Sequence, residues 1–110
     1  TARVLSGLGT PPPELLGHFE QAFGEACCLA FDYRDRHGRT SRRTVEPHGL
    51  LVEPPVWYVL ARDVERDAAR MFRMDRIARP RLVRERRFTP DLEGLHRQLQ
   101  RERGEAQAGG

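Results

Sequence analysis

The sequence predicts a mainly β domain: a small antiparallel barrel of about five strands, SH3-like or Sm-like, flanked by an N-terminal and a C-terminal α-helix. Short apolar runs alternate with turn residues along the middle of the chain, and helical periodicity is confined to its two ends. A length of 110 residues fits a single hydrophobic core. We expect residues 1–13 to form a linker, 14–90 the helix and barrel, and 91–110 the second helix with a flexible tail.

The first helix is expected over Glu14–Glu25. It follows three consecutive prolines, and Thr10 is of the residue type that caps helices. Its apolar residues recur at intervals of three and four: Leu15, Leu16, Phe19, Ala22 and Phe23. The helix is therefore amphipathic.

A first strand, Cys27–Tyr33, is expected directly after this helix, and a hairpin turn at Asp35–Gly38 follows it. The adjacent Cys27 and Cys28 suit neither a loop-closing disulfide nor a set of spaced metal ligands, so we expect buried thiols. Alternation predicts two faces for the strand: Leu29, Phe31 and Tyr33 on one, and Cys28, Ala30 and Asp32 on the other.

The second strand is expected to start with Ser41–Val45. Pro47 and Gly49 interrupt it, which predicts a bend or bulge of the kind that curls a strand around a small barrel. Leu50–Val52 continue the strand beyond the bend. The pair Pro54-Pro55 makes the next turn, and the apolar run Val56–Ala61 is expected to be a central strand.

A charged loop, 64–69, leads to an expected fourth strand, Arg70–Ile77. Because Phe72 and Ile77 fall on opposite faces by strict alternation, we expect a bulge near Asp75. Pro80 is expected to separate this strand from a last one, Leu82–Arg86.

The closing helix is expected over Asp91–Arg103. Asp91 follows a proline and is a good residue for the first position of a helix. Three leucines at helical spacing form one stripe: Leu92, Leu95 and Leu99.

All 19 basic residues are arginine, and the formal net charge is +3. Arginine offers a phosphate two parallel donors, although a compositional bias of the source explains the choice of arginine over lysine equally well. No apolar run approaches the ~20 residues of a membrane span, and no export signal is recognisable. We therefore expect a cytoplasmic protein with no membrane partner.

The residues for catalysis are not assembled in any recognisable pattern. There is no nucleophile with its base, no paired carboxylates and no set of spaced metal ligands, and four histidines are scattered along the chain: His18, His37, His48 and His96. We expect neither an enzyme nor a bound cofactor.

Three separated motifs carry a family resemblance. Trp57-Tyr58-Val59 stands where the WYL family has Trp-Tyr-Leu. Residues 43–50, Arg-Thr-Val-Glu-Pro-His-Gly-Leu, resemble the family's Arg-x-Val-Glu-Pro-x-Gly-Leu, and residues 70–77, Arg-Met-Phe-Arg-Met-Asp-Arg-Ile, resemble its Arg-x-Phe-Arg-Leu-Asp-Arg-Ile. With Phe88-Thr89-Pro90 at the exit, the likeness covers Glu14–Pro90. The chain thus resembles the WYL sensor domain of bacterial transcription regulators.

The resemblance implies an Sm-like barrel that senses single-stranded nucleic acid or a nucleotide-like effector. Binding would change the activity of an attached DNA-binding domain, usually N-terminal, which we expect in the full-length protein because residues 1–13 are too short for one. The segment after Pro90 departs from the family's longer extension. A homodimer is expected, but the shorter extension does not indicate how its two copies would assemble.

Six residues form the expected binding site: Tyr33, Arg43, His48, Arg70, Arg73 and Arg76. The arginines match family positions and can each donate two hydrogen bonds to a phosphate. The rings of the tyrosine and the histidine could stack on a base or hydrogen-bond to it. For any single arginine, pairing with Asp75 or Glu46 within the sheet explains the residue equally well.

Other aromatic and basic residues are set aside from this site. Trp57 is expected in the core, whereas Tyr58 either lines the barrel or lies at its rim. A basic run either steers an anionic partner or protects an edge strand: Arg79, Arg81, Arg84, Arg86 and Arg87.

Two further functions remain open. The same arginines could hold a single nucleotide, whose affinity would depend only weakly on salt, whereas a strand that contacts several phosphates loses affinity steeply. The domain could instead be a protein-interaction or dimerisation module, in which substitutions of Leu92, Leu95 and Leu99 abolish activity. The sequence names neither the ligand nor the regulated genes.

Overall fold

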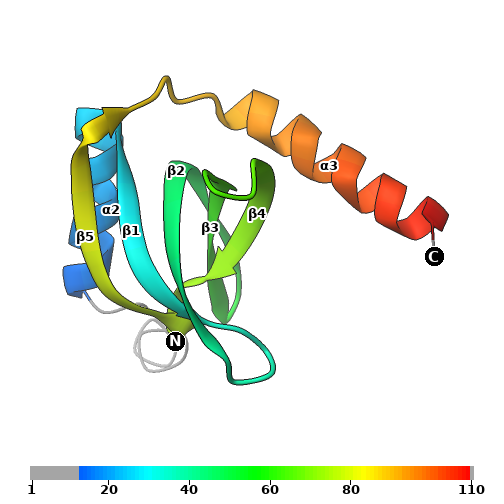
Figure 1. Ribbon diagram of the computed structural model, residues 1–110, viewed down its shortest axis with the longest axis horizontal. Helices are drawn as coiled ribbons and strands as arrows, with labels where there is room; N and C mark the ends of the chain where they lie inside the picture. The colour runs from blue at the N-terminus through cyan, green and yellow to red at the C-terminus, as the bar shows by residue number, and fades with distance from the viewer. Residues whose placement is uncertain (1–12, 110) are drawn as a thin grey trace.

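A computed structural model describes residues 13–109, with side chains up to residue 102. The expected Thr10 cap and all but the last residue of the expected linker lie outside the described residues. Five antiparallel strands form one sheet, with helix α2 on one side and helix α3 on another (Figure 1), which confirms the predicted mainly β class. The elements are α2 (Pro13–Glu25), β1 (Cys27–Arg34), β2 (Thr40–Glu53), β3 (Val56–Asp63), β4 (Ala68–Arg73), the 3-10 turn η1 (Met74–Arg76), β5 (Ile77–Arg87) and α3 (Leu92–Gly109).

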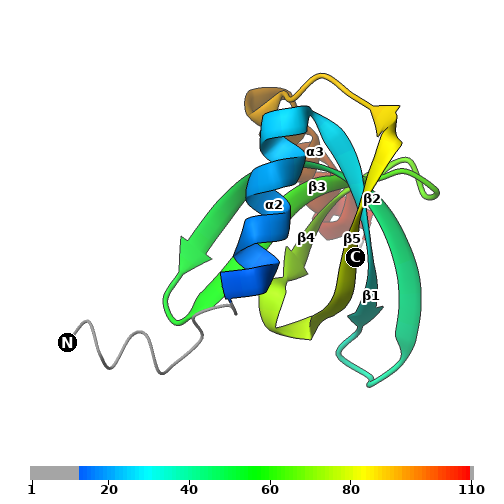
Figure 2. The ribbon, with the colours of Figure 1, turned by 90° about the vertical axis from the view of Figure 1, so that its left-hand side faces the viewer.

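The strands follow the order β4-β3-β2-β1-β5 across the sheet. Each pair of neighbours is antiparallel, and β5 returns to pair with β1. The sheet curves strongly (Figures 1 and 2), but β4 and β5 remain its two edges and do not pair with each other. The expected barrel is therefore an open, bent sheet, whose two edges are connected in sequence by η1.

The main hydrophobic core lies on the concave face of this sheet. Helix α2 contributes buried Leu15, Phe19 and Ala22, and β1 contributes Leu29, Phe31 and Tyr33. Trp57 is half-buried and packs against this core, as expected.

The opposite face of β1 has its own small cluster, formed by Cys28 and Ala30 with Val83 of β5. This arrangement confirms the predicted alternation along β1. Burial raises the pKa of both the Cys27 and the Cys28 thiol, so both stay protonated at neutral pH.

The predicted bend in β2 is a bulge at His48. The partner of Pro47 on β3 is Ala61 and that of Gly49 is Leu60, so His48 has no partner in the ladder. A Cβ atom at Gly49 would lie 2.6 Å from Leu92 Cδ1. Glycine at this position therefore allows the start of α3 to approach the sheet closely.

The prediction of one strand over Arg70–Ile77 was wrong. Strand β4 ends at Arg73, the buried Met74 lies in the 3-10 turn, and Ile77 begins β5. Strict alternation would put Phe72 and Ile77 on opposite faces of one strand. The turn removes this conflict by changing the direction of the chain between them, whereas a bulge was expected.

The prediction that Pro80 separates two strands was also wrong, because β5 runs through it. An edge strand has one side without a partner, so a residue lacking an N–H is tolerated there. Arg79 adopts a φ of 51°, and the β1–β5 register shifts between Ala30 and Asp32. Residues 79 and 80 therefore form a bulge within β5.

Helix α3 begins as predicted. The Gly94 N–H donates to Asp91 Oδ1 at 3.0 Å, which is the bond of an N-terminal cap. The helix runs to Gly109, past the expected end at Arg103, since glutamate, alanine and glutamine continue it favourably. Buried Leu95 and half-buried Leu99 pack on the outer face of the sheet.

Candidate functional site

A depression of about 360 Å³ lies between the end of the β1–β2 hairpin and η1. Three arginines from three elements line it: Arg34 at the end of β1, Arg76 in η1 and Arg79 in the bulge of β5. These arginines are far apart in the sequence but close in space, because β1 pairs with β5 and Tyr33 lies opposite Ile77. We call this surface the basic depression.

Two of these arginines are available to a ligand. The side chains of Arg34 and Arg76 make no hydrogen bond or ion pair within the described residues. Asp75 also lines the depression, and its pKa is lowered mainly by the hydrogen bond from Arg73 and to a smaller extent by the charge of Arg76. Both guanidiniums therefore retain N–H groups that could donate hydrogen bonds to phosphate oxygens.

The third arginine is held by a carboxylate. Asp32 is 8% exposed. Its carboxylate accepts hydrogen bonds from Arg42 Nη1 at 2.9 Å and from Arg79 Nε at 2.7 Å. Hydrogen bonds from these two arginines hold the pKa of Asp32 below its ordinary value. Asp32 is thus ionised and fixes Arg79 at the wall of the basic depression.

Arg73 is engaged next to this surface. Its Nε and Nη2 donate to the two oxygens of Asp75 at 3.0 and 2.8 Å, and this pair lowers the pKa of Asp75 and raises that of Arg73. Arg73 is two residues from Met71, which packs on the outer face of the sheet. Its side chain therefore lies on the outer face, beside half-buried Tyr58, its partner across β3.

Arg43 lies on the opposite, concave face and is committed to an internal ion pair. Its Nη1 donates to Asp63 Oδ2 at 3.0 Å, and Asp63 is fully buried. Arg66 donates to the same oxygen at 3.1 Å. The Arg43 guanidinium also lies 5.9 Å from the ring centre of Tyr33 and 5.8 Å from that of Phe72.

Tyr33 is part of the core. The residue is 9% exposed, and its ring contacts Phe31 and Phe72 edge-on. Its hydroxyl accepts a hydrogen bond from the backbone N–H of Arg73 at 3.1 Å, which connects β1 to the end of β4. The ring has little open surface on which a base could stack.

Arg70 is exposed on the edge strand β4. Its side chain donates to the neighbouring carbonyl of Ala69, at 3.2 Å. It is two residues from buried Phe72 and therefore shares the concave face with Arg43. Arg70 consequently has no carboxylate partner among the described residues.

His48 lies in the bulge of β2 and does not line the basic depression. Its Nδ1 accepts a hydrogen bond from the Asp91 N–H at 2.8 Å, and its ring contacts Phe88 edge-on. Nε2 is 3.7 Å from Glu46. Burial lowers the pKa of His48, against an opposing effect of Glu46.

The structure therefore groups the expected site residues in three places. Tyr33, Arg43 and Arg70 share the concave face, Arg73 and Arg76 flank Asp75 near the basic depression, and His48 is separate. Two residues were missed, Arg34 and Arg79. Two features of the sequence could have indicated them: Arg34 lies beside the predicted hairpin turn, and Arg79 belongs to the basic run that was set aside.

Two other arginines of that run, Arg84 and Arg87, have structural contacts. Arg84 Nε and Nη2 bind the Glu25 carboxylate at 2.7 and 3.1 Å, and Arg87 Nη1 donates to the Glu25 carbonyl at 2.6 Å. These bonds attach β5 to the end of α2. Within residues 13–102, no group of three or more His, Cys, Asp or Glu side chains could hold a metal ion. None of the described helices is long and apolar enough to cross a membrane.

Comparison with known proteins identifies the family. The model of the WYL domain matches residues 14–82, well over half of the chain. The chain belongs to the WYL domain family. It is 35% identical over 78 residues to protein PafB of Mycobacterium tuberculosis, a match that covers 70% of this chain and 23% of PafB. The PafB of Mycobacterium leprae is 37% identical over 57 residues, which is 51% of this chain and 17% of that protein.

A solved structure has the same fold. Proteasome accessory factor B/C (PafBC) of Arthrobacter aurescens superposes with a TM-score of 0.70 at 26% identity, over 80% of this WYL chain and 14% of that protein. The WYL chain thus spans less than a quarter of the length of these relatives.

Proposed function

We propose that this WYL domain is the ligand sensor of a transcription regulator and binds single-stranded nucleic acid through its arginines. The observation that supports this most strongly is the basic depression, where Arg34 and Arg76 present guanidiniums with no carboxylate partner in the part of the chain that the structure describes. Unpaired arginines beside a hollow suit phosphate oxygens, because each can donate two parallel hydrogen bonds.

The arginines divide into two roles in this proposal. Arg34, Arg70 and Arg76 contact phosphates, since their side chains form no ion pair in the described part of the chain. Arg43 and Arg73 support the surface through Asp63 and Asp75. Tyr33 and His48 support the domain in this proposal by positioning strand β4 and helix α3, and they do not contact the ligand directly.

The sensor acts within a longer protein in this proposal. An N-terminal DNA-binding domain reads the promoter, and the state of the WYL domain changes its activity in the cytoplasm. The relatives support this arrangement because they are much longer than this chain. A homodimer would bring two basic depressions into one regulator.

The test is fluorescence anisotropy of a labelled single strand of about 12 nucleotides, titrated with the domain over a salt series. Binding to several phosphates predicts a slope of log affinity against log salt near −0.7 for each phosphate neutralised, so a slope steeper than about −2 is expected. Failure to bind at low salt contradicts the proposal.

A second candidate is a nucleotide-like effector. The basic depression is a hollow of about 360 Å³, which is within the range of about 300–1000 Å³ for small-molecule pockets. A mononucleotide that competes with the strand and has a salt slope shallower than about −1 would favour this candidate.

A protein-interaction role receives less support from the leucine stripe. Leu95 is 4% exposed and Leu99 is half-buried, because both already pack on the sheet of the same chain. Leu92 remains exposed. The competing outcome would be a domain that binds no anionic ligand and loses activity on substitution of these leucines.

A further inference from the structure

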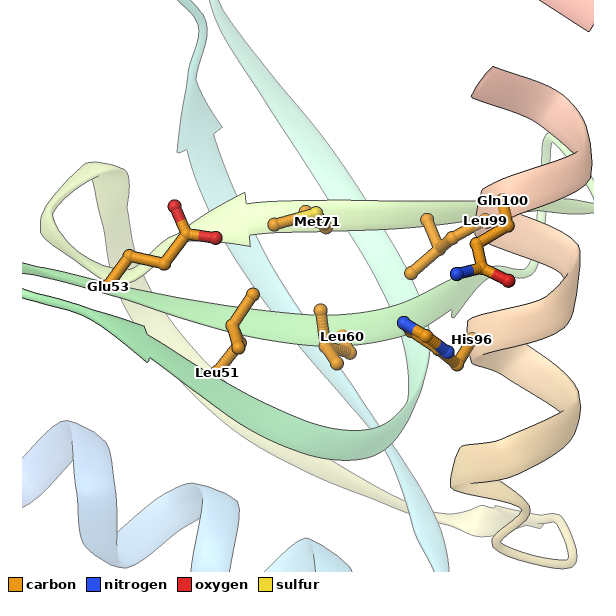
Figure 3. Close-up of a pocket in the computed structure, with 7 residues that line it drawn as sticks. All are labelled: Leu51, Glu53, Leu60, Met71, His96, Leu99 and Gln100. Carbon is orange, nitrogen blue, oxygen red and sulfur yellow. The ribbon is translucent and has the colours of Figure 1, made fainter. Parts of the chain in front are cut away.

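A second hollow lies on the outer face of the sheet, against α3, and shares no lining residue with the basic depression. It encloses about 290 Å³, near the lower limit of about 300 Å³ for small-molecule pockets, so its ligand is expected to be small. Figure 3 shows it between strands β2–β4 and the helix. We call it the helix-side pocket.

The floor of the helix-side pocket is apolar. Leu51 comes from β2, and Leu60 of β3 lies opposite Met71 of β4 in the ladder. Leu99 of α3 closes one side. Leu60 is 6% exposed, and the helix therefore shelters the floor without filling the space above it.

A carboxylate stands at one end of this floor. Alternation along β2 puts Glu53 on the same face as Leu51, and Figure 3 shows its side chain at the end away from α3. Glu53 is exposed and makes no hydrogen bond or ion pair to any residue that the structure describes. His96 and Gln100, one turn apart on α3, form the other end.

We propose that the helix-side pocket binds a small organic cation with an apolar body. The cationic group lies beside Glu53, and the apolar body covers Leu51, Leu60 and Met71. Apolar walls with a few polar groups that fix orientation are the usual composition of a ligand pocket. Among the described residues that line this pocket, Glu53 is the only carboxylate or arginine, and its negative charge selects a cation over an anion.

This inference is independent of nucleic-acid binding and would give the domain a second ligand-binding site. A ligand in the helix-side pocket contacts both the sheet and α3. It binds only the conformation in which α3 is seated, and it therefore stabilises that conformation as its concentration rises above its Kd. The position of α3 would then respond to the ligand.

The two methionines of the chain make a direct test possible. Met71 lines the helix-side pocket, whereas Met74 is 2% exposed in the main core and serves as an internal reference. The domain is labelled with 13C at the methionine methyl groups and titrated, in NMR, with 4-phenylbutylamine. The matched alcohol and the matched carboxylate, 4-phenylbutan-1-ol and 4-phenylbutanoate, are titrated in parallel.

The expected result is a saturable shift of the Met71 methyl signal with no shift of Met74. The amine should bind about fivefold more tightly than the alcohol, as for a partly exposed ion pair, and the carboxylate most weakly. Glu53→Gln should bring the amine and the alcohol within about twofold of each other. Glu65→Gln, at another exposed carboxylate with no partner among the described residues, should leave the preference intact.

Several results would overturn the proposal. A Met71 signal that does not shift, or a Met74 signal that shifts equally, excludes selective binding in this pocket. A carboxylate that binds as tightly as the amine, or a preference that survives Glu53→Gln, excludes the role of Glu53. A Met71 signal that changes with protein concentration alone shows that a second copy of the chain occupies the pocket.

Discussion

His48 Nδ1 accepts a hydrogen bond of 2.8 Å from the backbone N–H of Asp91. The histidine lies in the bulge of β2, and Asp91 caps α3, so this bond fixes the helix to the sheet at its first residue. Gly49, next to the histidine, allows Leu92 to approach. The bulge thus has a structural purpose that its sequence motif alone does not reveal.

Replacing His48 with alanine removes the acceptor for Asp91 and the ring contact with Phe88. The free energy of unfolding should fall by about 2 kcal/mol, measured by urea denaturation, because the hydrogen bond and the packing of a largely buried ring are lost together. His37→Ala, in the exposed hairpin turn, is the matched control and should change stability by less than about 0.5 kcal/mol. Equal stability of the two variants would show that the bond does not hold α3.

The His48 bond should also make stability depend on pH. Burial lowers the pKa of His48 in the folded chain below its ordinary 6.5, so the unfolded chain takes up a proton first as the pH falls. The contribution of His48 is therefore present above pH 6.5 and is lost as the pH falls through the lowered folded value. Glu46 and Asp91 oppose this shift, and Arg62 and desolvation favour it.

The check is to compare urea denaturation of the wild type and His48→Ala between about pH 5 and 8. The difference between their free energies of unfolding should shrink as the pH falls below 6.5. Carboxylates such as Asp32 and Glu46, whose pKa values are lowered, lose their contribution only at more acidic pH. Parallel curves for the two proteins would contradict the assignment to His48.

The buried carboxylate of Asp63 should be important for stability. Asp63→Asn leaves Arg43, whose side chain is 15% exposed, without its charged partner. We expect a loss of about 3 kcal/mol in urea denaturation, since an uncompensated charge remains inside the fold. Asp75→Asn, at the exposed Arg73 pair, should cost less than about 1 kcal/mol. Similar losses for both variants would refute the distinction between a buried and an exposed ion pair.

Much of the fold could be predicted because short-range pattern determines it. The alternation of Leu29 and Phe31 with Cys28 and Ala30 assigned the two faces of β1 correctly. The turn at η1 could not be predicted, because it depends on burying Met74 in a core built from distant strands. For a similar reason, no local signal tells that Pro80 lies on an edge strand.

The candidate site was harder to predict because ion pairs connect distant residues. Arg43 pairs with Asp63, 20 positions away, and Arg79 pairs with Asp32, 47 positions away. Whether an arginine is free for a ligand depends on such pairs. The sequence therefore selected both Arg76, whose side chain forms no ion pair among the described residues, and Arg43, which is engaged inside the fold.

The most direct test of the central proposal compares two double variants that remove the same charge. Arg34→Ala with Arg76→Ala removes the two arginines of the basic depression that have no ion pair among the described residues, whereas Arg97→Ala with Arg101→Ala acts on the exposed surface of α3. The affinity for a labelled single strand of about 12 nucleotides is measured by anisotropy over a salt series. The account predicts at least a tenfold loss for the first variant, with a salt slope shallower by about 1.4, and less than a twofold loss for the second. Equal losses in the two variants would show that nonspecific charge, and not the basic depression, binds the strand.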